Sequence, residues 1–487
     1  MQSQTQYMMK QLLFFFLFFA VLFQEVKAQS PAYKDEEFTQ FFRRTTGWVA
    51  SDATISIPIP ENRVLWLFGD THLDGYMSSD NTIPCLFQTR NSMMVQDKAH
   101  PDEFITILDQ TQIEMGRTPV KDPNNNDLYF WPGHGYSKGD TTIVFWGAYT
   151  GFEMTHTATY LTKIYTPGFT DATGIKELTK LPLPAGVEWG NAVVVDSAAQ
   201  YLYIYGHMKD WIINRPLVAR VSMDQDILDA WEFFDGNSWV NNNSAARQIM
   251  ASTDDYVSPS FSVIKLQDKY YMISQDIGFL TCGYGREIYS WESNSPEGPF
   301  TNKKLLYTIE DKYRGEYWVT YNATAHPQFI RNNELLISYN VNGFANNGVE
   351  GVTCQNECRD AFRDRRNADG YRPKFIRVPL TYIDPALDIP DRWFPETAPT
   401  GLPAGWEPLK QVRVYPNPSA GDRFTVEVKD AAPGAAVKVQ VRDLQGRLVL
   451  EQKMNGSTTN IHLKSSGMFL VYVTAGNKMS VSKVVVR

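Results

Sequence analysis

The stretch TISIPIPENRVLWLFGD, residues 54–70, contains two strand-like runs joined by a short polar turn. Small and β-branched residues fill the first run, and aromatic and aliphatic residues fill the second almost without a break, which is the composition that buried strands favour. The turn PENR between them holds the Pro and Asn that commonly reverse a chain. This stretch therefore predicts a β-hairpin whose second strand is buried.

The hairpin pattern recurs four more times, at residues 131–149, 191–208, 261–276 and 326–342. Consecutive second strands begin 78, 59, 69 and 65 residues apart, which leaves room for two further strands in each unit. Four-stranded units at a near-regular spacing are the anatomy of a β-propeller, whereas a two-sheet sandwich needs no such period. We therefore expect an all-β chain whose main domain is a five-bladed β-propeller.

The first 28 residues have the composition of an export signal. Lys10 is followed by an apolar run from Leu12 to Phe23 and then by the small residue Ala28. A charged start, a short apolar core and a small residue before the cut are typical of a cleaved secretory signal. The alternative is a membrane anchor, but the run is shorter than the roughly 20 residues that span a bilayer. We expect export and no stable transmembrane span.

The residue composition and the strand pattern of the chain change after residue 390. Residues 391–411 are rich in Pro, which predicts an irregular linker. Residues 412–487 hold short alternating strands with few aromatic residues, as in a small antiparallel β-sandwich. The expected order is a signal peptide at 1–28, the propeller at 29–390, the linker and a C-terminal β-sandwich.

The terminal segment resembles the C-terminal sorting domain of the type IX secretion system. The resemblance lies in the ordered motifs Val414–Pro418, Val441–Arg447, Gly467–Val473 and Lys483–Arg487. It implies contact with the type IX secretion machinery of a Bacteroidetes-type bacterium, passage through the periplasm and outer membrane, and secretion or attachment to the cell surface. A plain carbohydrate-binding sandwich is the alternative.

Composition and charge narrow the functional classes. The 487 residues are 43% hydrophobic and 13% aromatic, so they can build a large packed core. A net charge of −8 gives no basic footprint for nucleic acid. Cys354 and Cys358 lie four residues apart and could form a disulfide, which would leave Cys85 and Cys282 as the other possible pair. Free buried thiols are the alternative.

The first hairpin carries the leading candidates for catalysis. In a propeller, the starts of the innermost strands meet at one mouth of the central channel. Asp52 opens the hairpin and Asp70 closes it, so antiparallel pairing places both carboxyls at that mouth. Paired carboxylates hydrolyse glycosidic bonds, with one acting as acid and the other as base or nucleophile. The alternative for Asp70 is the capping of a turn.

A third acid is expected as proton donor, and other mouth residues are expected to bind substrate. We favour Glu188, at the start of the third hairpin, over Asp255, Glu287 and Glu316. The predicted substrate-binding residues are Trp131, His134, Trp189, Asn191, Tyr256, Asn322 and His326. Because a buried histidine more often has a structural role, we expect no metal or other cofactor, with a central calcium ion as the open alternative.

The main domain resembles the bacterial propellers grouped as domains of unknown function 4185 and 5005. The matching stretches are Ala50–Pro58, Leu65–Thr71, Trp131–Gly135, Asn294–Phe300 and Tyr321–Asn342. The resemblance extends to glycoside hydrolase families 43, 32 and 117 and to endo-acting arabinofuranosidases. It implies a base or nucleophile at Asp52. The chain departs from the pattern at Ala53, where a glycine is usual, and its third acid has no matching motif.

These features favour an exported glycoside hydrolase that cleaves a complex polysaccharide, an arabinofuranose-containing glycan being one candidate. The alternative is a non-catalytic glycan-binding propeller on the cell surface. A lyase or a structural surface protein is a third hypothesis. The chain has no G-x-S-x-G, H-E-x-x-H or P-loop motif, so it lacks the sequence motifs of serine hydrolases, zincins and nucleotide-binding proteins.

Overall fold

The computed structural model describes most of the main domain and most of the C-terminal module. The described residues are 30–109, 117–210, 213–277, 285–313, 315–345, 354–355, 358, 360, 362–393, 407–409, 412–419, 421–429, 436–443, 448–454, 456–476 and 478–486. The predicted signal peptide lies outside these residues, as does most of the predicted linker. Within them, no helix is long and apolar enough to cross a membrane.

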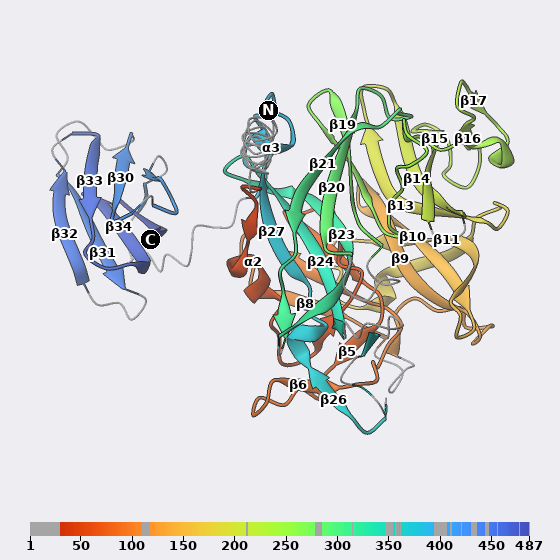
Figure 1. The fold of residues 1–487 in the computed structure, drawn as a ribbon, viewed down its shortest axis with the longest axis horizontal. Coiled ribbons are helices and arrows are strands. Elements are labelled where there is room, and N and C mark those ends of the chain that lie inside the picture. The colour runs from red at the N-terminus through yellow and green to blue at the C-terminus, as the bar shows by residue number, and fades with distance from the viewer. Residues whose placement is uncertain are drawn as a thin grey trace, which may run out of the picture.

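Antiparallel sheets build the main domain, and each large sheet starts from one of the predicted hairpins (Figure 1). The first sheet contains β3 (Ile55–Ile59), β4 (Arg63–Phe68), β7 (Ser92–Asp97) and β8 (Phe104–Ile107). The second contains β9 (Tyr129–Lys138), β10 (Thr141–Thr150), β11 (Thr155–Tyr165) and β12 (Ile175–Lys180). The third contains β13 (Val187–Asp196), β14 (Tyr201–Asp210), β15 (Ile213–Ser222), β16 (Glu232–Phe234) and β17 (Trp239–Val240).

Two more sheets follow along the chain. The fourth contains β18 (Ser262–Leu266), β19 (Lys269–Gln275), β20 (Glu287–Ser293) and β21 (Thr301–Thr308). The fifth contains β1 (Tyr33–Lys34), β27 (Lys374–Pro379), β24 (Glu334–Ala345), β23 (Glu316–Arg331), β22 (Lys312–Tyr313) and β25 (Cys354–Gln355). We call these five sheets blades 1 to 5.

Short elements connect and cover the blades. Small paired strands are β2 (Trp48–Ser51) with β5 (Thr71–Leu73) and β6 (Thr82–Pro84) with β26 (Arg365–Asn367). The helices are α2 (Glu36–Phe41), α3 (Leu380–Ile383), and the 3-10 turns η2 (Ala172–Gly174), η3 (Asn243–Ala245) and η4 (Ala368–Gly370).

The first strands of the blades contact one another in a closed cycle, from β3 through β9, β13 and β18 to β23 and back to β3. The N-terminal strand β1 pairs with β27, so blade 5 combines strands from both ends of the domain. A propeller closes in this way because its last blade would otherwise leave an unpaired edge. The predicted all-β propeller fold is confirmed, and five blades is our interpretation of the sheets.

A hydrophobic layer lies between each pair of neighbouring blades. Branched aliphatic residues dominate between blades 1 and 2, where Ile57, Leu67 and Met93 are buried beside Trp146. The layer between blades 5 and 1 is instead mainly aromatic. Its fully buried members include Phe38, Phe42, Trp48, Trp66, Phe329 and Phe375. Large rings bury the most area per residue, which suits the closing contact of the ring.

The cysteine pairing differs from the expectation. Cys85 is bonded to Cys358, with 5.6 Å between the Cα atoms, so the expected bridge between Cys354 and Cys358 is wrong. The pairing of β6 with β26 brings Cys85 and Cys358 together, and these residues are 273 positions apart in sequence. Proximity in sequence was a poor guide because the bridge joins two loops of different blades. Cys282 lies outside the described residues.

The C-terminal module is a small β-sandwich, drawn at the left of Figure 1. One sheet contains β28 (Glu407–Pro408), β35 (Lys478–Val486), β34 (Gly467–Ala475), β31 (Val437–Asp443) and β32 (Leu448–Met454). The other contains β29 (Val412–Tyr415), β30 (Arg423–Val428) and β33 (Thr458–His462). Phe424, Val439 and Val471 belong to a core that this module forms by itself.

Candidate functional site

Asp52 and Asp70 flank the first hairpin and are held together by backbone contacts. The Gly69 amide donates to the Asp52 carbonyl at 3.1 Å, and the Ser51 hydroxyl donates to the Asp70 carbonyl at 2.9 Å. A side chain at Gly69 would not fit, because its Cβ would lie 2.4 Å from Oδ1 of Asp52. Ala53 has a φ of 70°, in the left-handed region that favours glycine. The turn that presents Asp52 is therefore strained, and it explains why a glycine would suit position 53.

Two tyrosines hold one oxygen of Asp52. The hydroxyls of Tyr321 and Tyr371 each donate to Oδ2 at 3.1 Å. Tyr321 belongs to β23 of blade 5, and Tyr371 precedes β27 of the same blade. Burial raises the pKa of Asp52 above its usual value, and the two hydroxyls partly offset this rise. The closure of blade 5 onto blade 1 thus completes the surroundings of Asp52.

Asp70 interacts with an indole and a guanidinium. Trp131 Nε1 donates to Oδ1 at 3.1 Å, and Arg90 NH1 lies 3.3 Å from Oδ2. Burial raises the pKa of Asp70, and the negative charge of Asp52 raises it further, while Arg90 opposes both effects. The two carboxyls therefore retain a proton at a pH where separate aspartates are fully ionised. Such a pair provides one acid and one base in the same site.

An aromatic wall connects the pair to Glu188. The ring centroids of Trp131 and Tyr149 are 4.8 Å apart, and the Tyr149 hydroxyl donates to Glu188 Oε2 at 2.7 Å. His207 Nε2 lies 3.9 Å from the same oxygen, and its Nδ1 is 3.0 Å from Asn191 Oδ1. Glu188 is 31% exposed. The structure thus joins Asp52, Asp70, Trp131, Glu188 and Asn191 in one continuous network, with Glu188 at its open end.

Two predicted substrate-binding residues lie in packed interiors instead. Trp189 is 3% exposed and packs on Trp231, with a centroid distance of 5.8 Å, in the core between blades 2 and 3. His326 is fully buried, and its ring nitrogens are bonded to Ser56 at 2.5 Å and to Ser338 at 2.8 Å. Neither side chain reaches the mouth, so we remove both from the candidate site.

The remaining predicted residues lie at three separate places in the propeller. His134 Nδ1 is buried and has no hydrogen-bond partner among the described residues, and burial lowers the pKa of this histidine to about 4. Asn322 forms a left-handed turn in β23 with a φ of 56°. Tyr256 lies beside blade 4, where its ring is 5.8 Å from Lys303 Nζ. No contact links these three residues to the acid pair, and their binding roles stay predictions.

Blade 4 carries a second pair of acids. Asp276 follows β19 and Glu287 begins β20, and the Asp276 amide donates to the Glu287 carbonyl at 3.0 Å. Burial raises the pKa of Asp276 to about 6, with a further contribution from the charge of Glu287. The Tyr289 hydroxyl donates to Glu287, and Lys303 Nζ lies 4.4 Å from the Tyr289 ring centroid. The sequence signal for Asp276 is its place at the end of YYMISQD, which matches Asp70 at the end of VLWLFGD.

One of the other competing acids, Asp255, is paired elsewhere. Asp255 Oδ1 lies 3.6 Å from Lys303. The side chain of Glu316 lies outside the described part of the chain. Among the residues that the structure describes, no group of three or more His, Cys, Asp or Glu side chains is placed to hold a metal ion. The absence of a cofactor stays a prediction.

Comparison with solved structures found several similar chains. A crystal structure from Bacteroides ovatus, whose description suggests a hydrolase, shares 24% sequence identity, with a TM-score of 0.60 over 75% of this chain and 96% of that one. A GH43_1 enzyme from Xanthomonas citri in complex with xylose shares 11% identity, with a TM-score of 0.38 over 70% and 93% of the two chains. An α-L-arabinanase mutant from Cellvibrio cellulosa shares 10%, with a TM-score of 0.38 over 71% and 99%.

A curated relative matches only a small part of the chain. Ulvan lyase NLR42 from Nonlabens ulvanivorans is 36% identical over 104 residues, which are 20% of this chain and 18% of the lyase. The matched segment of this chain thus covers less than a fifth of the length of that relative.

Two families account for nearly all of the described residues. Residues 413–487 match the secretion system C-terminal sorting domain, which marks the protein as secreted or attached to the cell surface. Residues 35–406, more than half of the chain, match the domain of unknown function DUF5005. The chain therefore belongs to the DUF5005 family and ends in a secretion system sorting domain.

Proposed function

We propose that this protein is an exported glycoside hydrolase acting at the Asp52–Asp70 mouth of the propeller. The observation that carries the proposal is the pair of carboxyls at the two ends of the first hairpin, Asp52 bound by two tyrosines and Asp70 by Trp131 and Arg90, with burial raising the pKa of both. One protonated and one ionised carboxyl supply the acid and the base that glycosidic hydrolysis requires. Aromatic rings beside acids suit a sugar, whose ring has an apolar face and polar edges.

Each acid has a proposed role. Asp52 acts as base or nucleophile, because Tyr321 and Tyr371 bind one of its oxygens and stabilise its ionised form. Asp70 supports it by holding the shared proton. Glu188 donates a proton to the leaving oxygen from the partly exposed end of the wall. Asp70 is the second candidate for this donor, since its raised pKa lets it keep a proton near neutral pH.

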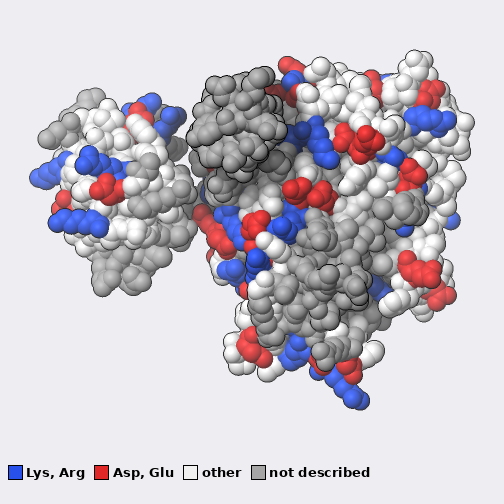
Figure 2. All heavy atoms as spheres, viewed as in Figure 1, with Lys and Arg blue, Asp and Glu red and all other residues white. Residues whose placement is uncertain are grey.

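The substrate and the export route follow from the same site and the sorting module. We propose a complex polysaccharide as the substrate, with arabinofuranose-containing glycans first among the candidates. We also propose that residues 1–28 direct export, that 29–390 form the catalytic propeller, and that the type IX machinery recognises residues 412–487. On the face shown in Figure 2, basic and acidic side chains are interspersed, which suits an uncharged ligand better than a nucleic acid.

The test is hydrolysis by the purified mature chain, residues 29–487, on arabinan, arabinoxylan and xylan, measured as release of reducing ends. The Asp52→Asn variant should lower kcat/KM on the responsive glycan by about 10³-fold or more. The matched control is Asp210→Asn, because Asp210 is a 55% exposed acid at the end of β14. Binding of the glycan without release of reducing ends would instead support a non-catalytic glycan-binding propeller.

A further inference from the structure

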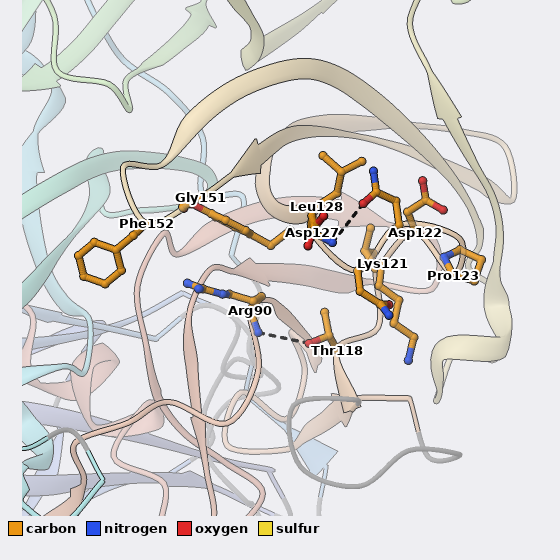
Figure 3. A pocket seen from close by; sticks show the side chains of 13 residues that line it. Arg90, Thr118, Lys121, Asp122, Pro123, Asp127, Leu128, Gly151 and Phe152 are labelled. Atoms are coloured by element: carbon orange, nitrogen blue, oxygen red, sulfur yellow. Dashed lines mark hydrogen bonds between the residues drawn. The ribbon is translucent and has the colours of Figure 1, made fainter.

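A cavity of about 710 Å³ opens beside the acid pair, between residues 118–128 and the turn that joins β10 to β11 (Figure 3). Its volume is typical of sites that hold small molecules, which range from about 300 to 1,000 Å³. The side chains that matter for its chemistry are Arg90, Lys121, Asp122, Asp127, Tyr129 and Phe152. We call this cavity the lateral pocket.

Two side chains are shared between the lateral pocket and the acid pair. Arg90 lines the pocket while its NH1 lies 3.3 Å from Asp70 Oδ2, and its guanidinium lies 4.4 Å from the Tyr129 ring centroid. Tyr129 also lines the pocket, and its ring is 5.3 Å from that of Trp131. Only one layer of side chains therefore separates the pocket from the carboxyls. A sugar chain that extends from Asp70 across the Arg90 and Tyr129 side chains would enter the pocket.

Hydrogen bonds fix both walls of the lateral pocket. Asn91 is fully buried; its amide group donates to the carbonyls of Val120 at 2.8 Å and Phe130 at 3.0 Å, and its Oδ1 accepts from the Val120 amide at 3.1 Å. On the opposite wall, the Tyr129 hydroxyl donates to the Gly151 carbonyl at 3.0 Å. The pocket is thus formed before any ligand binds, which lowers the entropic cost of binding.

The lining of the lateral pocket suits an uncharged, hydroxyl-rich ligand. Arg90 and Lys121 contribute two positive charges, and Asp122 and Asp127 contribute two negative charges. Lys121 is already paired with Asp109 at 2.8 Å, and Arg90 with Asp70. A uronate or sulfated sugar would therefore meet two carboxylates without a surplus of positive charge. Hydroxyl groups, which both donate and accept, can bond to either kind of side chain.

An exposed aromatic ring stands at the rim of the lateral pocket. Phe152 has a relative exposure of 103% and extends from the turn between β10 and β11, as Figure 3 shows. A single exposed apolar side chain is common on protein surfaces, so what matters for this ring is its place in the lining of the pocket. Its flat face matches the apolar face of a sugar ring, in the same way as the indole of Trp131 beside the acid pair.

We propose that the lateral pocket is a second glycan subsite, which takes neutral sugar units of the same polysaccharide on the Asp70 side of the scissile bond. This inference rests on the proposed hydrolysis at Asp52 and Asp70 and deepens it, because it assigns a neutral, extended oligosaccharide as the substrate. Cleavage then occurs within a chain, and recognition requires several units rather than one.

The test is calorimetric titration of the mature chain carrying Asp52→Asn, so that bound ligands are not cleaved. The probes are α-1,5-linked arabinobiose and arabinohexaose, xylobiose and xylohexaose, with a hexamer of galacturonate as the anionic comparison. One neutral hexaose should bind about tenfold more tightly than its biose. Adding Phe152→Ala or Asp127→Ala should weaken the hexaose about five- to tenfold and leave the biose within about twofold.

A matched control comes from the same blade. Tyr165 is a 48% exposed aromatic residue at the far end of β11 from the mouth, so Tyr165→Ala should leave all affinities unchanged. The proposal is overturned if neither neutral hexaose binds, if affinity is independent of length, if Phe152→Ala has no effect, or if the galacturonate hexamer binds more tightly than the neutral ones. Failure of the proposed hydrolysis alone gives a different result. Affinity would still increase with the length of the neutral oligosaccharide, but the chain that retains Asp52 would not cleave it.

Discussion

Blades 1 and 4 each carry two acids at the same mouth, but in different positions. In blade 1 the acids flank the first and second strands, at Asp52 and Asp70, whereas in blade 4 they flank the second and third strands, at Asp276 and Glu287. The first strand of each blade borders the channel. The blade 1 pair is therefore closer to the channel, and the difference shows that the strand that presents an acid decides its depth in the mouth.

The partners of the two pairs differ as well. Asp52 accepts hydrogen bonds from Tyr321 and Tyr371 of blade 5, so its surroundings depend on closure of the ring. Glu287 accepts from Tyr289, two residues further along the same strand. The blade 1 pair has hydrogen-bond partners in another blade, so the whole fold holds it in place. The blade 4 pair has a partner in its own strand, so its surroundings are local. We expect catalysis to depend on the first pair only.

Loss of the space that Gly69 provides should have a large effect on the blade 1 pair, second only to loss of the Asp52 carboxyl itself. Gly69→Ala places a Cβ 2.4 Å from Oδ1 of Asp52, so the carboxylate must move. A displacement of this kind costs about 10²-fold in rate when the group is catalytic. Steady-state kcat/KM on the responsive glycan is the measurement. Gly370→Ala is the control, because its Cβ would only meet Trp318 ring atoms at 4.0 Å. Equal activity of the two variants would contradict the proposed role of Asp52.

Removal of the Asp70 carboxyl should change the dependence of stability on pH. Because burial and Asp52 raise the pKa of Asp70 above its unfolded value, the folded protein binds more protons and loses stability as pH rises from about 4 toward neutrality. Asp70→Asn lacks this loss. Its Tm relative to the wild type should therefore increase by about 1–3 °C between pH 5 and pH 8.

The control for that effect is again Asp210→Asn, because Asp210 is exposed and forms an ion pair with Arg215 on the same hairpin. The difference in Tm between this variant and the wild type should not change with pH. A Tm difference for Asp70→Asn that is constant or that falls between pH 5 and pH 8 would show that the two carboxyls do not share a proton.

The smallest effect is expected at Trp131. The indole N–H stabilises the ionised form of Asp70 at 3.1 Å, so Trp131→Phe should raise the pKa of Asp70 further while keeping a ring beside Tyr149. Because Asp70 must keep its proton, the basic limb of the kcat/KM profile should move to higher pH by about half to one unit. Tyr289→Phe, the corresponding change in blade 4, should leave that limb in place. If the limb stays in place for both variants, the titration of Asp70 does not control the rate.

The fold was predictable because the hairpin repeats five times in the sequence, and hairpin pairing is local. The same locality identified Asp52 and Asp70, whose proximity follows from strand register alone. Tyr321, Tyr371 and Arg90 were not predicted. The tyrosines are 269 and 319 residues from Asp52, and their contacts exist only after the ring has closed. A single sequence contains no local signal for such contacts.

Side-chain alternation explains why Glu188 and Trp189 have different surroundings. Successive residues of a strand point to opposite faces, so Glu188 and Trp189 cannot both face the mouth. Glu188 does so, and Trp189 packs into the core. His326 is placed in the same way, inside a network of serine hydroxyls. These residues were predicted from their type and their position in the chain. Side-chain alternation would have distinguished Glu188 from Trp189.

The most direct test of the account compares Asp52→Asn with Asp276→Asn on one responsive polysaccharide, measured as initial rates of reducing-end release. Both changes replace a carboxyl whose pKa is raised mainly by burial, so a general effect of removing such a group is controlled. The account predicts a loss of about 10³-fold or more for Asp52→Asn and a rate within about threefold of the wild type for Asp276→Asn. Equal losses, or the larger loss at Asp276, would contradict it.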